Sequence, residues 1–121
     1  MKFHLSRTEG NTVTGTGPGW VRVNADEYRA SFVLSPERVI STWASSFESL
    51  TESDFEAILA LAPEIALVGT GAKQRFPHPR LYRALTDSRI GVEIMDTSAA
   101  ARTFNIVAAE GRRVVAGLIL P

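Results

Sequence analysis

The chain has 121 residues, of which 45% are hydrophobic, and this is the usual size of one compact domain with one core. Lysine and arginine number 13 together, as do aspartate and glutamate, so the formal net charge is zero and the basic excess of nucleic-acid-binding proteins is missing. The absence of cysteine excludes disulfides, thiolate zinc sites and thiol nucleophiles.

The first residues, MKFHLSRTEG, hold no apolar run behind their basic residues, and no run of eighteen apolar residues occurs anywhere in the chain. We therefore expect a soluble protein without membrane insertion. The expected location is the bacterial cytoplasm, or the mitochondrion if the chain is a processed eukaryotic protein. The length predicts a single domain over residues 1–121.

The first third of the chain is rich in glycine, threonine, valine and aromatic residues, which favours strands separated by turns. Turn residues are supplied by GTGPGW at 15–20 and by VNADEY at 23–28. We predict hairpin-connected, antiparallel strands near residues 11–16, 20–24, 28–34 and 38–43.

A helix is predicted to begin at Ser53, because Ser53 and Glu56 have the spacing of a capping box. Pro63 should end this helix, since proline has no N–H to donate and disfavours helical angles at the residue before it. The residues that would share the apolar face of the helix are Phe55, Ile58, Leu59 and Ala62.

From residue 65 onward, apolar strands alternate with helices. The predicted elements are a strand at 65–69, a helix at 80–88, a strand at 90–95, a helix at 98–110 and a strand at 113–120, with Gly111 capping the last helix. This alternation favours parallel pairing with right-handed crossovers, and the apolar run Val114 to Leu120 is typical of a strand covered on both faces. The predicted fold is α/β, with N-terminal antiparallel strands followed by a βαβαβ-type, mainly parallel central sheet.

Several motifs give little indication of catalysis or of ligand binding. The GTG at 69–71 follows a strand, as a phosphate-binding loop would, but Gln74 stands where the third glycine is needed and the prolines of RFPHP prevent a helix. A tight turn is therefore the better interpretation. His4 and His78 have no carboxylate at ligand or triad spacing, and no GxSxG elbow occurs. We expect no catalytic residues, no metal site and no cofactor, and we favour a protein that is not an enzyme.

One pair of segments could still form a binding site. Asp96 and Thr97 stand where the N-cap of the last helix is predicted, and a helix start with free N–H groups favours an anion. Arg102 could add a guanidinium fork. The strands ending at Val68 and Met95 would bring both segments to one edge of a parallel sheet, where crevices form. The candidate ligand-binding residues are Gly69, Thr70, Gly71, Lys73, Arg75, Asp96, Thr97, Arg102 and Asn105.

A purely structural interpretation of the same residues stays open. Asp96 and Thr97 can cap the helix without any ligand, which is worth about 1 kcal/mol. Arg102 can pair with Glu93 or Asp96, and the alanines at 99–101 can allow close helix packing. The residues alone do not separate these alternatives.

The stretches GPGWVRVN, EYRASFVLSPE, LAPEIALVGTG, RFPHPRL and GVEIMDTSAAARTFNIVAAEGRRVVAGLI, with Trp43, resemble a known family. It contains the mitochondrial complex I (NADH:ubiquinone oxidoreductase) alpha-subcomplex assembly factor three and its small bacterial relatives of unknown function. The resemblance covers nearly the whole chain. It implies a layered β/β/α domain with a mixed central sheet. For the eukaryotic relatives it implies a non-enzymatic role as assembly partners of a respiratory complex. The family often has a cysteine where this chain has Ala101.

Two functional hypotheses follow. The first is an assembly-factor-like interaction module that binds another protein. Aromatic residues such as Trp20, Trp43 and Phe47 could face the partner, although core packing is the better interpretation for either tryptophan. The second is a small-molecule or weak anion-binding protein, or an uncharacterised enzyme, using residues 69–75 and 96–105. A contiguous exposed apolar patch would favour the first, and a concave pocket the second. Neither the oligomeric state nor the partner is predicted.

Overall fold

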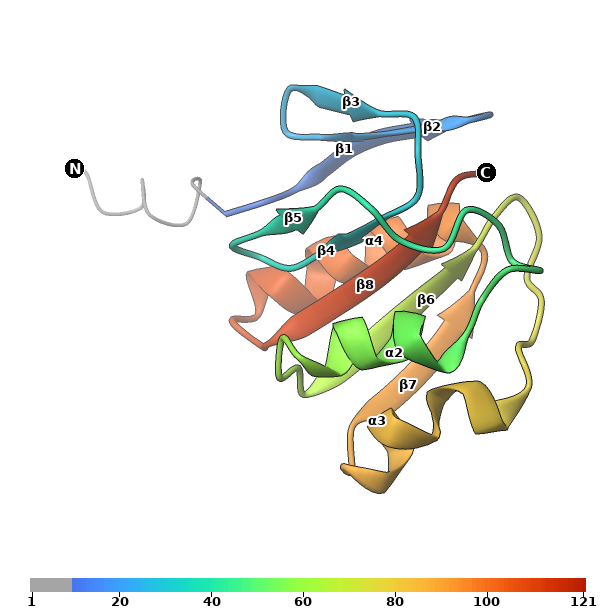
Figure 1. Cartoon of the computed structure of the whole chain (residues 1–121). Helices are drawn as coiled ribbons and strands as arrows, with labels where there is room; N and C mark the ends of the chain where they lie inside the picture. Colours follow the sequence, from blue (N-terminus) through green and yellow to red (C-terminus); the bar gives the residue numbers. More distant parts are fainter. Residues whose placement is uncertain (1–9) are drawn as a thin grey trace.

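The N-terminal strands form a small antiparallel sheet in the computed structural model, which describes residues 10–121 (Figure 1). Its strands are β1 (Val13–Gly17), β2 (Trp20–Val23) and β3 (Asp26–Tyr28), in the order β1-β2-β3. Val21 and Val23 of β2 are buried, whereas Trp20 and Arg22, which alternate with them, are half-buried. This alternation means that one face of the small sheet packs on the rest of the protein.

The second sheet has five strands in the order β5-β4-β8-β6-β7. They are β4 (Phe32–Leu34), β5 (Val39–Ile40), β6 (Ile65–Thr70), β7 (Gly91–Met95) and β8 (Val114–Ile119). β6 pairs in parallel with both β7 and β8, whereas β4 pairs antiparallel with β5 and β8. Every residue of β6 and β8 is buried, which confirms the central strands predicted from their apolar runs.

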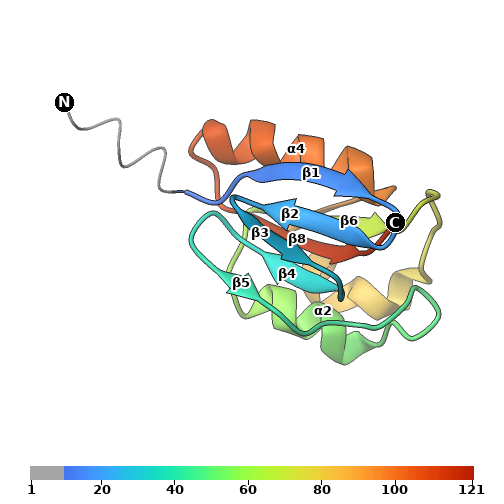
Figure 2. The same ribbon diagram turned by 90° about the horizontal axis from the view of Figure 1, so that it is seen from above.

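Helices cover both faces of the large sheet. They are α2 (Glu52–Leu59), the 3-10 turn η1 (Pro79–Tyr82), α3 (Arg83–Asp87) and α4 (Thr97–Ala109). Figure 2 shows α4 and α2 on opposite sides of the sheet. One hydrophobic cluster joins α4, the small sheet and one sheet face, and a second joins α2 and α3 to the other face. No helix within residues 10–121 is long and apolar enough to cross a membrane.

The predicted strand at 28–34 is wrong as one element, because its two halves belong to different sheets. β3 ends at Tyr28, β4 begins at Phe32, and the chain between them passes from the small sheet to the large one. The rings of Tyr28 and Phe32 stack with centres 4.7 Å apart, so both apolar residues still reach the same core. The pattern of apolar residues is continuous across this passage, which explains the error.

The strand predicted at 38–43 is also shorter than expected, with only Val39 and Ile40 paired. Beyond Ile40 the chain leaves the sheet, and the ring of Trp43 lies on β8 at Gly117. A Cβ atom at Gly117 would lie only 2.4 Å from the Trp43 ring. The Trp43 indole N–H also donates to the carbonyl of Asp54 at 2.9 Å. Trp43 is therefore a packing residue of the second core cluster.

The start of the first helix differs from the prediction at Ser53. The helix begins at Glu52, and Thr51 is its N-cap. The Asp54 carboxylate accepts from the Thr51 backbone N–H at 2.8 Å and from the Thr51 hydroxyl at 3.0 Å. A carboxylate three residues into the helix thus performs the role that the sequence suggested for Glu56. The helix ends at Leu59, and Ala62 before Pro63 has a φ of 52°, outside the helical region.

Asp54→Ala should lower the free energy of unfolding by about 1 kcal/mol, because it removes the acceptor at the helix start. Ser53→Ala is the matched control, since Ser53 is exposed and makes no cap in the structure, and it should change stability by less than about 0.5 kcal/mol. Urea denaturation of both variants measures this difference. Equal losses in the two variants would place the helix start at Ser53 after all.

Candidate functional site

The carboxyl ends of the three parallel strands meet at one edge of the large sheet, as expected for residues 69–75 and 96–102. Thr97, at the start of α4, joins these ends and is fully buried. Its backbone N–H donates to the carbonyl of Gly71 at 2.9 Å, and its hydroxyl accepts from the Gly71 N–H at 2.8 Å. The same hydroxyl donates to the carbonyl of Ile119 at the end of β8. Thr97 therefore ties β6, α4 and β8 together.

The two glycines of the GTG segment have different roles. Gly71 has a φ of 104° where the chain bends after β6, a conformation that favours glycine. Gly69 lies within β6, and a Cβ atom at this position would lie 2.8 Å from the Thr97 Oγ1 and 3.0 Å from its Cα. Gly69 is needed because the start of α4 approaches the strand so closely.

The start of α4 offers fewer free N–H groups than an anion site would need. Asp96 is the N-cap, and its carboxylate accepts from the Ala99 N–H at 2.9 Å. The N–H of Thr97 is bonded to Gly71, and that of Ala100 to the carbonyl of Asp96. The capping role considered for Asp96 is thus confirmed. Anion binding at this helix start stays a prediction, although the N–H groups of Thr97, Ala99 and Ala100 are already bonded.

Arg102 and Asn105 do not point to a shared ligand. The exposed Arg102 donates to the Ser98 hydroxyl at 3.1 Å, and among residues 10–121 it forms no ion pair with Glu93 or Asp96. The Asn105 amide accepts from the backbone N–H of Val13 and donates to the carbonyl of Val13, both at 2.9 Å. Asn105 thus holds β1 against α4, and its polar atoms are already used.

A crevice of about 540 Å³ opens beside these strand ends, and we call it the strand-end crevice. Four segments line it: the link between β3 and β4 at Arg29–Ser31, the loop between β5 and α2, the residues after β6, and the end of β8. Of the nine candidate residues, Thr70, Gly71 and Arg75 line this crevice. Asp96 lines a smaller cavity with Gly71, and Asn105 lines a third one. The candidate ligand-binding residues that line a cavity are therefore divided among three cavities.

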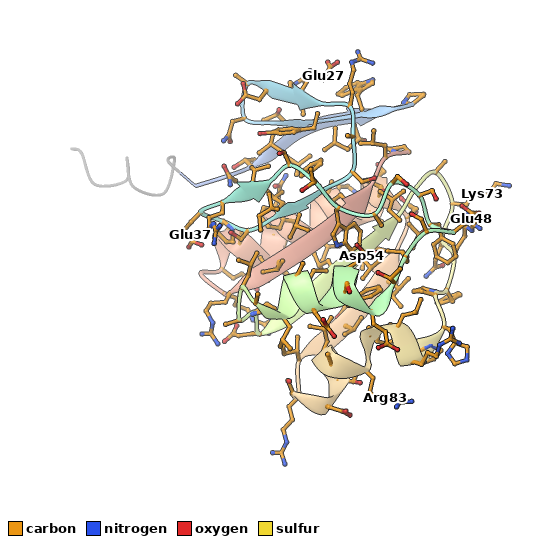
Figure 3. The ribbon with its side chains drawn as sticks, viewed as in Figure 1. Glu27, Glu37, Glu48, Asp54, Lys73 and Arg83 are labelled. Atoms are coloured by element: carbon orange, nitrogen blue, oxygen red, sulfur yellow. The ribbon has the colours of Figure 1, made fainter. Side chains whose placement is uncertain are left out.

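Arg75 is held in the wall of the strand-end crevice by two side chains of the loop between β5 and α2. Its guanidinium carbon lies 4.1 Å from the centre of the Phe47 ring, and its Nη2 lies 2.5 Å from the Glu48 Oε2. The hydrogen bond from Arg75 holds the pKa of the Glu48 carboxyl below its usual range. Figure 3 shows Glu48 and Lys73 at the same edge of the molecule, with the exposed Lys73 side chain directed away from it.

The loop after β6 is fixed by Thr70 and His78. The buried Thr70 hydroxyl donates to the carbonyl of Lys73 at 2.5 Å and accepts from the Arg75 N–H at 3.1 Å. His78 caps η1, because its Nδ1 accepts from the Arg80 N–H at 3.1 Å. His4, the other histidine, lies outside the described residues. No cluster of three or more His, Asp or Glu side chains suited to a metal occurs in the part of the chain that is described.

Phe76 is a residue that the sequence analysis did not single out. Its side chain is 73% exposed, although the neighbouring Pro77 is buried. By contrast, Trp43 packs on Gly117, and Phe47 is half-buried beneath Arg75. Trp20 is half-buried across Gly15 and Gly17 of the small sheet. A sequence signal for Phe76 did exist, because it is an aromatic residue in a polar, proline-rich loop outside any periodic pattern.

Comparison with known proteins gives a consistent group of relatives. A family model described as a protein of unknown function (DUF498/DUF598) matches residues 13–119. The mouse protein named NADH dehydrogenase [ubiquinone] 1 alpha subcomplex assembly factor 3 is 40% identical over 74% of this chain and 49% of its own length. This chain therefore spans about half the length of that curated relative.

Bacterial proteins match over more of their length. The 13 kDa major membrane protein of Francisella tularensis is 31% identical, with 76% of each chain covered. A crystal structure of a Bordetella parapertussis protein superposes with a TM-score of 0.86 and 41% identity, covering 93% of this chain and 97% of the other. These matches confirm the resemblance and the mixed α/β fold that the sequence indicated.

Proposed function

Because the chain belongs to the family of unknown function DUF498/DUF598 and is similar over most of its length to curated assembly factors, we propose that it is a non-enzymatic, assembly-factor-like module that binds another protein. We place its partner among the subunits of a respiratory membrane complex, since the mouse relative is named for the assembly of NADH dehydrogenase. The cytoplasm of a bacterium is the location that we propose for this binding.

One observation carries the proposal, and it is the exposed aromatic ring of Phe76. We call residues 71–78, between β6 and η1, the Phe76 loop. Its backbone is held by Thr70 at one end and by His78 at the other, and Pro77 within it is buried. A loop that is already ordered loses little conformational entropy when a partner binds. Exposed aromatic and arginine side chains are enriched at the centres of protein interfaces, and Arg75 precedes Phe76 here.

Phe76→Asp should remove the partner from the tagged chain purified from its native cell, because a charged group replaces the apolar contact. The matched control is Ile106→Asp, which alters the second large apolar side chain that is exposed within residues 10–121, 62% exposed on α4. Quantitative mass spectrometry of retained proteins is the measurement. We expect at least one protein to be depleted about tenfold or more by Phe76→Asp and to be kept by Ile106→Asp.

Two results would contradict this function. If both variants retain the same proteins in the same amounts as the unaltered chain, the Phe76 loop is not the contact surface. If the unaltered chain retains nothing beyond the tag alone, the interaction function itself fails.

A second candidate function is small-molecule binding in the strand-end crevice. Its volume of about 540 Å³ favours this candidate, because ligand pockets are commonly of this size. The crevice also lies outside the carboxyl ends of parallel strands, where open α/β sheets bind ligands. A metabolite that copurifies with the chain in place of a protein would support this alternative.

A further inference from the structure

We propose that Arg75 is a receptor for a carboxylate side chain of a protein partner, and that Glu48 occupies this receptor in the free chain. The partner's acidic residue would replace Glu48 at the mouth of the strand-end crevice. This inference rests on the proposed interaction function and adds to it the chemistry of the partner. It also assigns a role to Glu48, which neither caps α2 nor packs in the hydrophobic core.

The guanidinium of Arg75 is positioned to receive a carboxylate. The Phe47 ring supports one face of it, with 4.1 Å between the guanidinium carbon and the ring centre. A guanidinium has five N–H donors in a flat fork that matches the two oxygens of a carboxylate. Within residues 10–121, the Arg75 side chain uses one of its nitrogen atoms, Nη2, on Glu48. The stacked orientation leaves further donors for a second oxygen.

Glu48 is held weakly enough to be exchanged. Its side chain is 69% exposed and that of Arg75 is 43% exposed, so water screens their attraction. Ion pairs of this kind contribute little to stability, and one carboxylate can replace another there at small cost. Glu48 is charged near neutral pH, as glutamates ordinarily are, and the hydrogen bond from Arg75 lowers its pKa further, so the internal carboxylate competes with an incoming one.

The charge around the crevice favours an acidic partner. The charged residues that line it are Arg29, Arg75 and Glu48. Arg29 pairs with Glu27, which is not part of the lining. When Glu48 leaves, the lining keeps two positive charges and no negative one, and the exposed Lys73 lies on the same edge (Figure 3). The crevice would thus select an acidic side chain over a basic one by charge complementarity.

The test is an NMR titration of the full chain with two capped tetrapeptides, acetyl-Gly-Glu-Gly-Gly-amide and its glutamine counterpart. The signals to follow are the Arg75 Nε–H and the backbone amides of residues 46–49 and 71–76. Only the glutamate peptide should shift them, with a dissociation constant of about millimolar or weaker. Removing an exposed competing carboxylate should tighten binding about two- to sixfold in Glu48→Gln. Arg75→Gln should abolish the shifts.

Glu37→Gln is the matched control, since it removes one exposed negative charge at the opposite end of the molecule (Figure 3). It should leave the affinity for the glutamate peptide unchanged. Equal tightening in Glu48→Gln and Glu37→Gln, or equal shifts with both peptides, would overturn the receptor role of Arg75. If Phe76→Asp loses a retained protein but neither peptide binds the chain, only the receptor role of Arg75 fails. If the glutamate peptide binds but the unaltered chain retains no partner, the interaction function fails instead.

Discussion

Phe104→Ala should lower the free energy of unfolding by about 3 to 5 kcal/mol, because it empties a large volume in the core. Phe104 lies on α4 and is fully buried. It belongs to the cluster in which α4, the small sheet and one face of the large sheet meet. The helix contacts both β6 and β8 through this face. Chemical denaturation gives the loss directly.

Ile106→Ala is the control for this experiment, because Ile106 lies on the same helix with 62% of its side chain exposed. Its loss should stay below about 1 kcal/mol. A loss below 1 kcal/mol for Phe104→Ala would mean that the face of α4 assigned to the core is not the one that stabilises the protein.

Thr97→Val should lower the free energy of unfolding by about 2 to 5 kcal/mol, although the two side chains have nearly the same shape. The valine leaves the Gly71 N–H without its acceptor and the Ile119 carbonyl without its donor, at a fully buried position. Hydrogen exchange should show faster exchange of the Gly71 amide in the variant.

Thr103→Val is the matched control for this change. Thr103 is half-buried on the same helix, and within residues 10–121 its hydroxyl donates only to the sulfur of Met95, at 3.5 Å. A weak sulfur acceptor contributes little, so the loss should be below about 1 kcal/mol. Equal losses for the two threonines would show that Thr97 does not tie the strand ends together.

The central part of the fold could be predicted because its signals are local. Strands β6 and β8 are apolar except for Thr70 at the end of β6, and a helical segment follows each of β6 and β7 before the next strand. Such a pattern leaves parallel pairing as the simplest arrangement. Gly111, with a φ of 80°, ends α4 as predicted, since a residue with no side chain adopts this conformation without strain.

The passage between the two sheets could not be predicted, since nothing in residues 28–34 marks a break in the apolar pattern. The helix start was misplaced for a related reason. Thr51 with Asp54 and Ser53 with Glu56 both have the spacing of a capping box, and only the fold decides which pair closes the first turn. Local sequence therefore indicated most of the elements, but neither the division between β3 and β4 nor the start of the first helix.

The sequence indicated which segments meet at this edge of the sheet, but not which partners their side chains contact. Asn105 is hydrogen-bonded to Val13, which lies 92 residues earlier in the chain, and no spacing pattern in the sequence predicts such a contact. Arg75 and Glu48 meet across 27 residues in the same way. The polar, proline-rich loop around Phe76 was a signal for an exposed aromatic ring, but the degree of exposure depends on what the surrounding loops cover, which a single sequence does not reveal.

The most direct test of the interaction function replaces Phe76 by a photoreactive phenylalanine analogue in the native cell. Illumination should join the chain to one distinct protein at this position. The same analogue at position 106, on the exposed side of α4, should not capture that protein. Capture of the same protein set from both positions, or no capture from position 76 in a folded chain, would contradict the account.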